Sequence, residues 1–142
     1  MQYKRLGTTH IAFRLNPGEE LVESIEKIAR EANITTAMIQ GLGATNDIVL
    51  ETYRASEKKY YHHRLTGDFE ITSITGTIDL LNNDYYSHLH ITIADQEGHS
   101  HGGHLTSAII SVTAEMILTL LPEDIHRDYD EEAELNLWQL DE

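Results

Sequence analysis

The stretch "SHLHITIADQEGHSHGGHL", residues 87–105, combines an alternating segment, a turn and a second segment rich in histidine. His88 and His90 alternate with aliphatic residues, which is the period-two pattern of a strand with one buried face. Gly98 supplies the positive φ that a type I turn followed by a bulge requires. The stretch therefore predicts a β-hairpin with an aliphatic core face and imidazoles on the opposite face.

The first two histidines are spaced for a shared ligand. Strand geometry places the Cα atoms of His88 and His90 roughly 6.6 Å apart on one face. Two imidazoles at this spacing can converge on one cation, with Zn–N bonds of about 2.0–2.1 Å.

The contribution of His104 depends on the register of the hairpin. If Ala94 pairs with His99, His104 falls on the aliphatic face of the partner strand. One extra residue moves His104 opposite His90 instead. We expect that extra residue as a bulge at Gly102-Gly103, because glycine within a strand often marks one.

Two interpretations of the histidines follow from spacing alone. With the bulge, His88, His90 and His104 form a three-imidazole site whose fourth coordination position is open to water or substrate. The alternative is the polar outer face of a hairpin, which titrates near pH 6.5. His99 and His101 lie at the turn and are interpreted as surface residues. His62 and His63 are adjacent and would face opposite sides of a strand, so they do not readily bind one ion together. His10 and His126 are isolated and are interpreted as satisfied or solvent-facing.

One helix is predicted within "NPGEELVESIEKIAREAN", residues 16–33. The apolar residues at helical spacing on one face are Leu21, Ile25, Ile28, Ala29 and Ala32. Asn16, Pro17 and Glu19 suit the N-cap, first-turn and capping-box positions. Asn33 is an acceptable stop.

Most of the remaining sequence is predicted to form strands. The segments are residues 10–15, 35–43 and 44–53 joined by a turn near Gly41–Gly43, 69–81, 88–94, 105–121 and 133–140. One helix against many antiparallel strands predicts an α+β fold, an antiparallel sandwich or partly closed barrel. The length of 142 residues predicts one domain, residues 1–142.

The composition restricts the classes of function. The chain has no cysteine, which excludes disulfides and thiolate metal sites, so a metal must be held by imidazole and carboxylate. The formal net charge of −14 opposes binding to nucleic acid, whose affinity comes mostly from lysine and arginine. No signal-peptide pattern or membrane-spanning run is found, so we expect a cytoplasmic location without membrane contact. The acidic "YDEEAEL", residues 129–135, is interpreted as solvated.

Several motifs occur in an order that resembles a known family. They are "NPGEELVESI", "IQGLGAT", "GDFEITS", the H-x-H and G-G-H pair, and "RDYDEE". Together they resemble the stand-alone prokaryotic form of the plants-and-prokaryotes-conserved (PPC) domain, named "predicted DNA-binding protein with PD1-like motif". The resemblance implies a PPC-like α+β fold, a homotrimer, and a metal held by His88, His90 and His104. The metal would be zinc or another divalent transition metal, since several of them accept imidazole.

The resemblance leaves three candidate functions. The first is a trimeric metal-binding domain that binds or hydrolyses a small molecule at the open coordination position. No reaction or catalytic residue is assigned, because nothing in the sequence places Glu70 or Glu115 beside the cation. The second is a DNA-associated or transcription-regulatory oligomerisation module, and the third is a protein–protein scaffold.

This chain differs from the plant relatives of the family in one motif. Plant relatives carry a basic AT-hook and the segment Gly-Arg-Phe-Glu-Ile-Leu, whereas residues 67–72 here read "GDFEIT".

Overall fold

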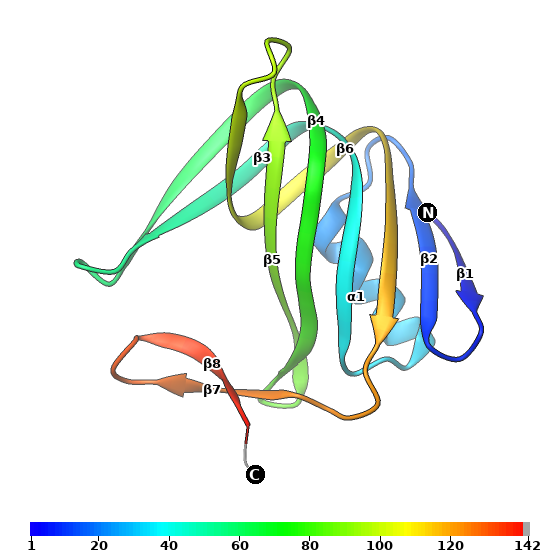
Figure 1. Ribbon diagram of the computed structural model, residues 1–142, viewed down its shortest axis with the longest axis vertical. Coiled ribbons are helices and arrows are strands. Elements are labelled where there is room, and N and C mark those ends of the chain that lie inside the picture. The colour runs from blue at the N-terminus through cyan, green and yellow to red at the C-terminus, as the bar shows by residue number, and fades with distance from the viewer. Residues whose placement is uncertain (141–142) are drawn as a thin grey trace.

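The computed structural model describes residues 1–140, which contain eight strands and one helix (Figure 1). In chain order the elements are β1 (Gln2–Leu6), β2 (His10–Leu15), α1 (Leu21–Ala32), β3 (Ala37–Arg54), β4 (Lys59–Leu81), β5 (Asp84–Ala94), β6 (Ser100–Leu120), β7 (His126–Asp130) and β8 (Leu135–Gln139). Four of the strands are long and carry most of the sheet.

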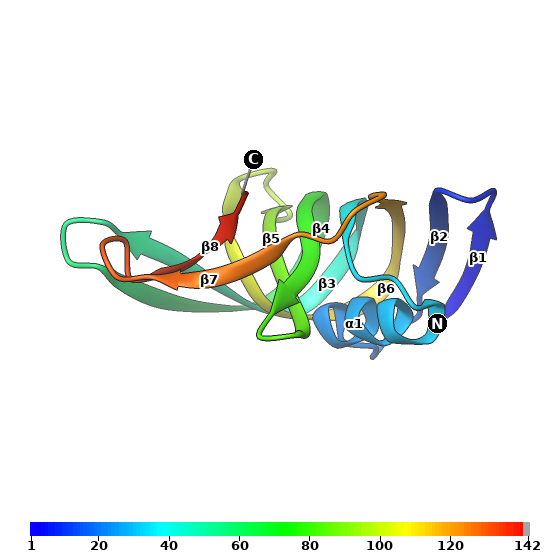
Figure 2. The same ribbon diagram turned by 90° about the horizontal axis from the view of Figure 1, so that it is seen from below.

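The strands form one sheet that closes partly on itself. The order along the sheet is β1-β2-β6-β3-β4-β7-β8, and β5 pairs with both β4 and β6. Strands β3, β4, β5 and β6 therefore form a closed ring of hydrogen-bonded neighbours, which confirms the predicted α+β fold with a partly closed barrel. Within the described residues all pairings are antiparallel except a two-residue parallel contact between β4 and β7. Helix α1 lies against one face of the sheet (Figure 2).

The helix buries the face that its sequence pattern predicts. Leu21, Ile25, Ile28 and Ala29 are fully buried in the hydrophobic core. Asn33 ends the helix in the left-handed conformation, with φ of 52°, as expected for a C-terminal asparagine. Among the described residues, no helix has both the length and the apolar character needed to cross a bilayer.

The predicted start of the helix was wrong. Asn16 is not the N-cap: the carbonyl of Asn16 accepts a hydrogen bond from the Glu19 amide at 3.2 Å, across a turn that contains Gly18 with φ of 85°. This positive φ keeps the turn out of the helical path. The cap is Glu20, whose carboxylate accepts a hydrogen bond from the Glu23 amide at 2.7 Å.

The predicted turn near Gly41–Gly43 was also wrong, because β3 runs without a break from Ala37 to Arg54. The ladder between β3 and β4 shifts register between Gly41 and Gly43, so the irregularity is a bulge. A Cβ atom at Gly43 would lie 2.3 Å from the Thr113 carbonyl oxygen. The glycine allows close approach of β6 and does not reverse the chain.

Strand β4 is much longer than its alternating core segment. It begins at Lys59, and with β3 it forms an arm that extends beyond the ring (Figure 1). A register shift between Ile71 and Ser73 then moves the buried side of β4 from Ile71 to Ile74. A bulge of one residue exchanges the two faces of a strand, so the alternation of the sequence does not continue through it.

Candidate metal centre

The hairpin of β5 and β6 brings the three predicted histidines together. His90 pairs directly with His104 across the two strands, and His88 lies two residues from His90 on the same strand. The ring centroids are 5.3 Å apart for His88 and His90, 5.3 Å for His88 and His104, and 5.8 Å for His90 and His104. One ring nitrogen from each histidine lies within 4.8 Å of the other two.

The register that places His104 arises in the turn and not from a bulge, so the expected bulge at Gly102-Gly103 was wrong. The ladder begins with Ala94 paired to Ser100 and continues without a shift to His90 and His104. The extra residue is in the loop, where the Asp95 amide donates to the His99 carbonyl at 3.0 Å. Gly98 has the expected positive φ, 81°.

The paired glycines have a different role, which is close packing of β6 between its two neighbours. A Cβ atom at Gly102 would lie 2.9 Å from the Ile91 carbonyl oxygen on β5. A Cβ atom at Gly103 would lie 2.6 Å from the Glu51 carbonyl oxygen on β3. Both contacts are shorter than real Cβ atoms make, so larger residues here would push His104 away from its partners.

Burial favours the neutral form of two of the rings. The pKa of His88 is lowered to about 4, first by burial and then by the positive charge of Arg127. Burial also lowers the pKa of His104, although the nearby Glu51 carboxylate acts in the opposite direction. Both imidazoles are therefore neutral at pH 7, which is the form that binds metal ions.

The donors fit a divalent transition metal. The Nδ1 atom of His104 is buried and has no hydrogen-bond partner among the described residues. An unpartnered buried polar atom costs about 1–3 kcal/mol, and a metal ligand bond would satisfy it or orient the ring that carries it. A zinc ion binds imidazole nitrogens at about 2.0–2.1 Å, and these residues would hold it through ring nitrogens that lie within 4.8 Å of one another. His90 is exposed, which leaves one side of the cluster open to solvent.

Side chains of β3 and β4 that no local pattern predicts lie beside the cluster. Glu51 pairs with His104 in the ladder between β3 and β6, and its carboxylate lies 2.9 Å from Nδ1 of His62. The Tyr60 ring lies 6.0 Å from the His104 ring, and burial raises the pKa of the Tyr60 hydroxyl. These residues are more than forty positions from His104 in the chain, so only the non-local pairing of β3 with β6 reveals them.

The two strand carboxylates considered from sequence lie elsewhere. Glu70 pairs with Ala44 and with Ala94, the last residue of β5, six residues from His88. Glu115 pairs with Leu42 and lines a concave surface of the sheet. The structure places neither carboxylate in the histidine cluster.

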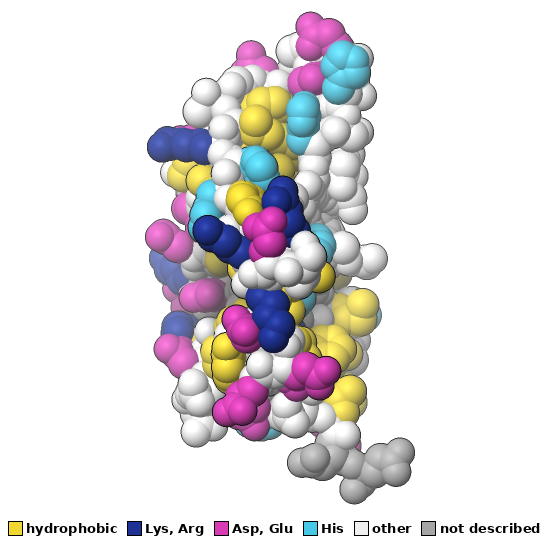
Figure 3. Space-filling view, turned by 90° about the vertical axis from the view of Figure 1, so that its left-hand side faces the viewer, with side chains coloured by type: hydrophobic (Ala, Val, Ile, Leu, Met, Phe, Trp, Pro, Cys, Tyr) yellow, Lys and Arg dark blue, Asp and Glu magenta, His cyan; other side chains and the backbone are white. Residues whose placement is uncertain are grey.

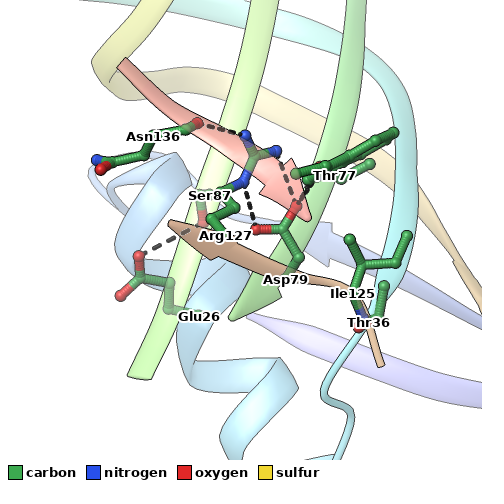
Figure 4. Close-up of polar contacts among 9 residues, drawn as sticks. Glu26, Thr36, Thr77, Asp79, Ser87, Ile125, Arg127 and Asn136 are labelled. Atoms are coloured by element: carbon green, nitrogen blue, oxygen red, sulfur yellow. Dashed lines mark hydrogen bonds and ion pairs between the residues drawn. The ribbon is translucent and has the colours of Figure 1, made fainter. Parts of the chain in front are cut away.

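A buried ion pair supports the strand next to His88 (Figure 4). Asp79 is fully buried, and its carboxylate accepts hydrogen bonds from Arg127 Nε at 2.6 Å and from a terminal guanidinium nitrogen at 2.8 Å. It also accepts from the Thr77 hydroxyl at 2.9 Å and the Trp138 indole at 2.8 Å. Because Thr77 pairs with His88, this network connects the hairpin of β7 and β8 to the strands that carry the histidine cluster.

The remaining histidines lie outside the cluster. His99 and His101 are exposed at the turn, as predicted. His10 and His63 contact the hydroxyls of Thr9 and Thr52, respectively. Residues 131–134, three of which are glutamates, form the turn between β7 and β8, and Tyr129 is 60% exposed, in agreement with a solvated segment.

The fold and the shared motifs define the class of protein. Residues 1–122 match the Plants and Prokaryotes Conserved (PCC) domain. The chain therefore belongs to this family, called the PPC family here.

Solved structures of similar proteins agree with this assignment. A candidate DNA-binding protein from Bacteroides thetaiotaomicron has 29% identity and a TM-score of 0.93, over 97% of this chain and 96% of the other. A metal-containing protein from Archaeoglobus fulgidus has 28% identity and a TM-score of 0.86, over 99% of both chains. A plant- and prokaryote-conserved protein from Pyrococcus horikoshii has 27% identity and a TM-score of 0.86, over 99% of this chain and 95% of the other.

Curated relatives match over a small part of their own length. The chain is 33% identical over 111 residues to the bifunctional protein GlmU of Synechococcus sp. (strain JA-2-3B'a(2-13)), which is 78% of this chain and 16% of that protein. GlmU of Synechococcus sp. (strain JA-3-3Ab) is 31% identical over 106 residues, which is 74% of this chain and 16% of that protein. The chain thus spans about a sixth of the length of the curated relatives it matches.

Proposed function

We propose that this PPC protein binds one divalent transition metal ion, zinc in the first instance, through His88, His90 and His104. The observation that carries the proposal is the convergence of three ring nitrogens within 4.8 Å on one face of the hairpin. The Archaeoglobus relative is described as metal-containing, which supports a metal in this family. Three imidazoles are a donor set that zinc, nickel, cobalt and copper all accept.

The proposed site has an open coordination position that a small molecule can occupy. Zinc held by these three imidazoles would supply Lewis acidity and would lower the pKa of a coordinated water to about 7. The rings of His88 and His104 are partly buried, whereas His90 is exposed on the side from which a ligand can approach. The Glu51 carboxylate lies near enough to His104 to affect its pKa, so it gives this side of the site negative charge.

The open position can be tested with cobalt as a spectroscopic probe. Stripped protein loaded with Co²⁺ is expected to show visible absorption of a four-coordinate ion, and azide is expected to shift those bands by replacing a solvent ligand. The expected shift saturates with one azide per cobalt. A cobalt spectrum that azide leaves unchanged at millimolar concentration would show that the position is closed.

We also propose that the chain forms a homotrimer through the sheet face opposite α1. Met38, Leu42 and Ile117 are exposed to 46%, 55% and 38%, although they lie on central strands of the sheet. Alternation along β3 places Met38 and Leu42 on the face opposite buried Ile39. Adjacent exposed apolar side chains on a sheet are typical of an interface between subunits.

Substitution of this face is expected to dissociate the assembly. Light scattering of the wild type should give three times the 16.1 kDa chain mass, and Leu42→Asp with Ile117→Asp should give the mass of one chain. Two buried, unpaired carboxylates per subunit would oppose association. Leu140→Asp is the control, because Leu140 is 70% exposed and follows β8. A monomeric wild type, or a trimeric double variant, would contradict the proposed interface.

A DNA-associated role is the second candidate, and it rests on the description of the Bacteroides relative. The formal net charge of −14 opposes it, because phosphate binding depends on lysine and arginine. Ten lysines and arginines stand against twenty-four acidic residues in the chain. The metal centre is therefore the better supported function.

A further inference from the structure

A second group of metal-ligating side chains lies at the turn between β5 and β6. The residues are Asp95, Glu97, His99 and His101, and the turn projects beyond the ring of strands (Figure 1). Histidine and acidic side chains gather at that end of the molecule (Figure 3). The group belongs to the same hairpin as the three-histidine centre but occupies its opposite end.

Two imidazoles approach the same carboxylate oxygen. Asp95 Oδ2 lies 3.3 Å from Nδ1 of His99 and 3.5 Å from Nε2 of His101. The side chains of His99 and His101 are 74% and 43% exposed, so both rings are accessible to ions from solvent. Glu97 adds a second carboxylate: one ligand atom each from Asp95, Glu97 and His99 lie within 4.8 Å of one another.

The turn backbone fixes the central carboxylate. Asp95 Oδ1 accepts hydrogen bonds from the Glu97 amide at 3.1 Å and the His99 amide at 2.8 Å. The Gly98 amide donates to the Asp95 carbonyl at 3.0 Å, which closes the turn. Because Oδ1 is engaged by the backbone, Oδ2 is held toward the imidazoles, and a ligand that is already oriented loses less entropy on binding.

We propose that this turn is a second cation site, which binds a divalent transition metal through Asp95, Glu97 and His99, with His101, whose ring approaches Asp95 Oδ2, as a further ligand. Two imidazoles and carboxylate oxygens suit zinc, nickel or copper better than calcium or magnesium, which prefer oxygen ligands alone. The site is more exposed than the three-histidine centre and has fewer imidazoles. We therefore expect the turn to bind zinc more weakly.

Zinc titration by calorimetry of tag-free, metal-stripped protein tests this proposal. Wild type should bind two zinc ions per chain in two affinity classes. The His99→Ala, His101→Ala double variant should lose the weaker class and keep the tighter one. Asp95→Asn should weaken the same class at least tenfold while preserving the turn, since an asparagine carbonyl can still accept the two amide hydrogen bonds. His10→Ala, at an exposed histidine remote from both groups, should bind as the wild type does.

The outcomes separate this site from the metal centre proposed above. Both sites are supported if His88→Ala loses only the tighter zinc binding and the turn variants lose only the weaker zinc binding. A wild type that binds one zinc per chain, lost in His88→Ala but retained in the turn variants, would overturn the second site alone. A weaker class unaffected by the turn variants would also overturn it. If zinc binding is unchanged in His88→Ala and lost in the turn variants, the turn site stands and the three-histidine centre fails.

Discussion

Replacing His104 by alanine is expected to remove the tightly bound zinc while the protein remains folded. The ring of His104 completes the three-nitrogen cluster, and β6 is held in place by its own ladder with β3 and β5. Loss of an outer-shell partner alone weakens metal affinity roughly 10- to 100-fold, so loss of a ligand should weaken it by more than about 100-fold. The substitution also removes Nδ1, a buried nitrogen without a hydrogen-bond partner in residues 1–140, which limits the stability cost in the metal-free protein.

Elemental analysis after gel filtration measures this loss, with circular dichroism as the test of folding. His10→Ala is the matched control, because His10 is exposed and its ring makes its hydrogen bond with the hydroxyl of the neighbouring Thr9. His104→Ala protein that keeps the tightly bound zinc would show that this ring is not a ligand.

Replacing Asp79 by asparagine is expected to lower the free energy of unfolding by about 3–5 kcal/mol, the usual cost of removing one partner from a buried ion pair. Asp79 is fully buried and the side chain of Arg127 is 4% exposed, so the guanidinium would keep its charge without a counter-ion. The variant also weakens the hydrogen bonds from Thr77 and Trp138. We expect the hairpin of β7 and β8 to detach from β4 before the rest of the sheet unfolds.

Urea unfolding monitored by fluorescence measures both effects, because Trp138 is the single tryptophan of the chain. Undocking of the hairpin should shift its emission to longer wavelength at urea concentrations where circular dichroism is still native. Asp84→Asn is the control, since Asp84 pairs with Arg30 on the surface with 71% of its side chain exposed and should change stability little. An Asp79→Asn midpoint equal to that of the control would contradict the structural role of the buried pair.

Local patterns predicted the elements whose residues bury one face. The spacing of Leu21, Ile25 and Ile28 predicted α1, and alternation predicted β2 and the hairpin. Local patterns did not predict where a strand begins or ends when residues far away in the sequence decide it. Gly43 was interpreted as part of a turn, although it is required by the approach of Thr113 from β6. No property of residues 41–43 alone distinguishes these two uses of glycine.

The histidine cluster shows the same difference between local and non-local information. Strand spacing placed His88 and His90 together, and the arithmetic of the hairpin required one extra residue to bring His104 opposite His90. The structure puts this residue in the turn after Asp95, because hydrogen bonds of the turn set where the ladder begins. The positions of Glu51 and Tyr60 beside His104 could not be predicted, since they depend on how β3 and β4 lie next to β6.

Diffraction from zinc-loaded crystals at the zinc absorption edge most directly tests whether three rings of the β5–β6 hairpin hold one ion. We expect an anomalous peak at about 2.0–2.1 Å from one nitrogen of each of His88, His90 and His104. Zinc-loaded crystals in which the rings at 88, 90 and 104 surround no anomalous peak would contradict the account.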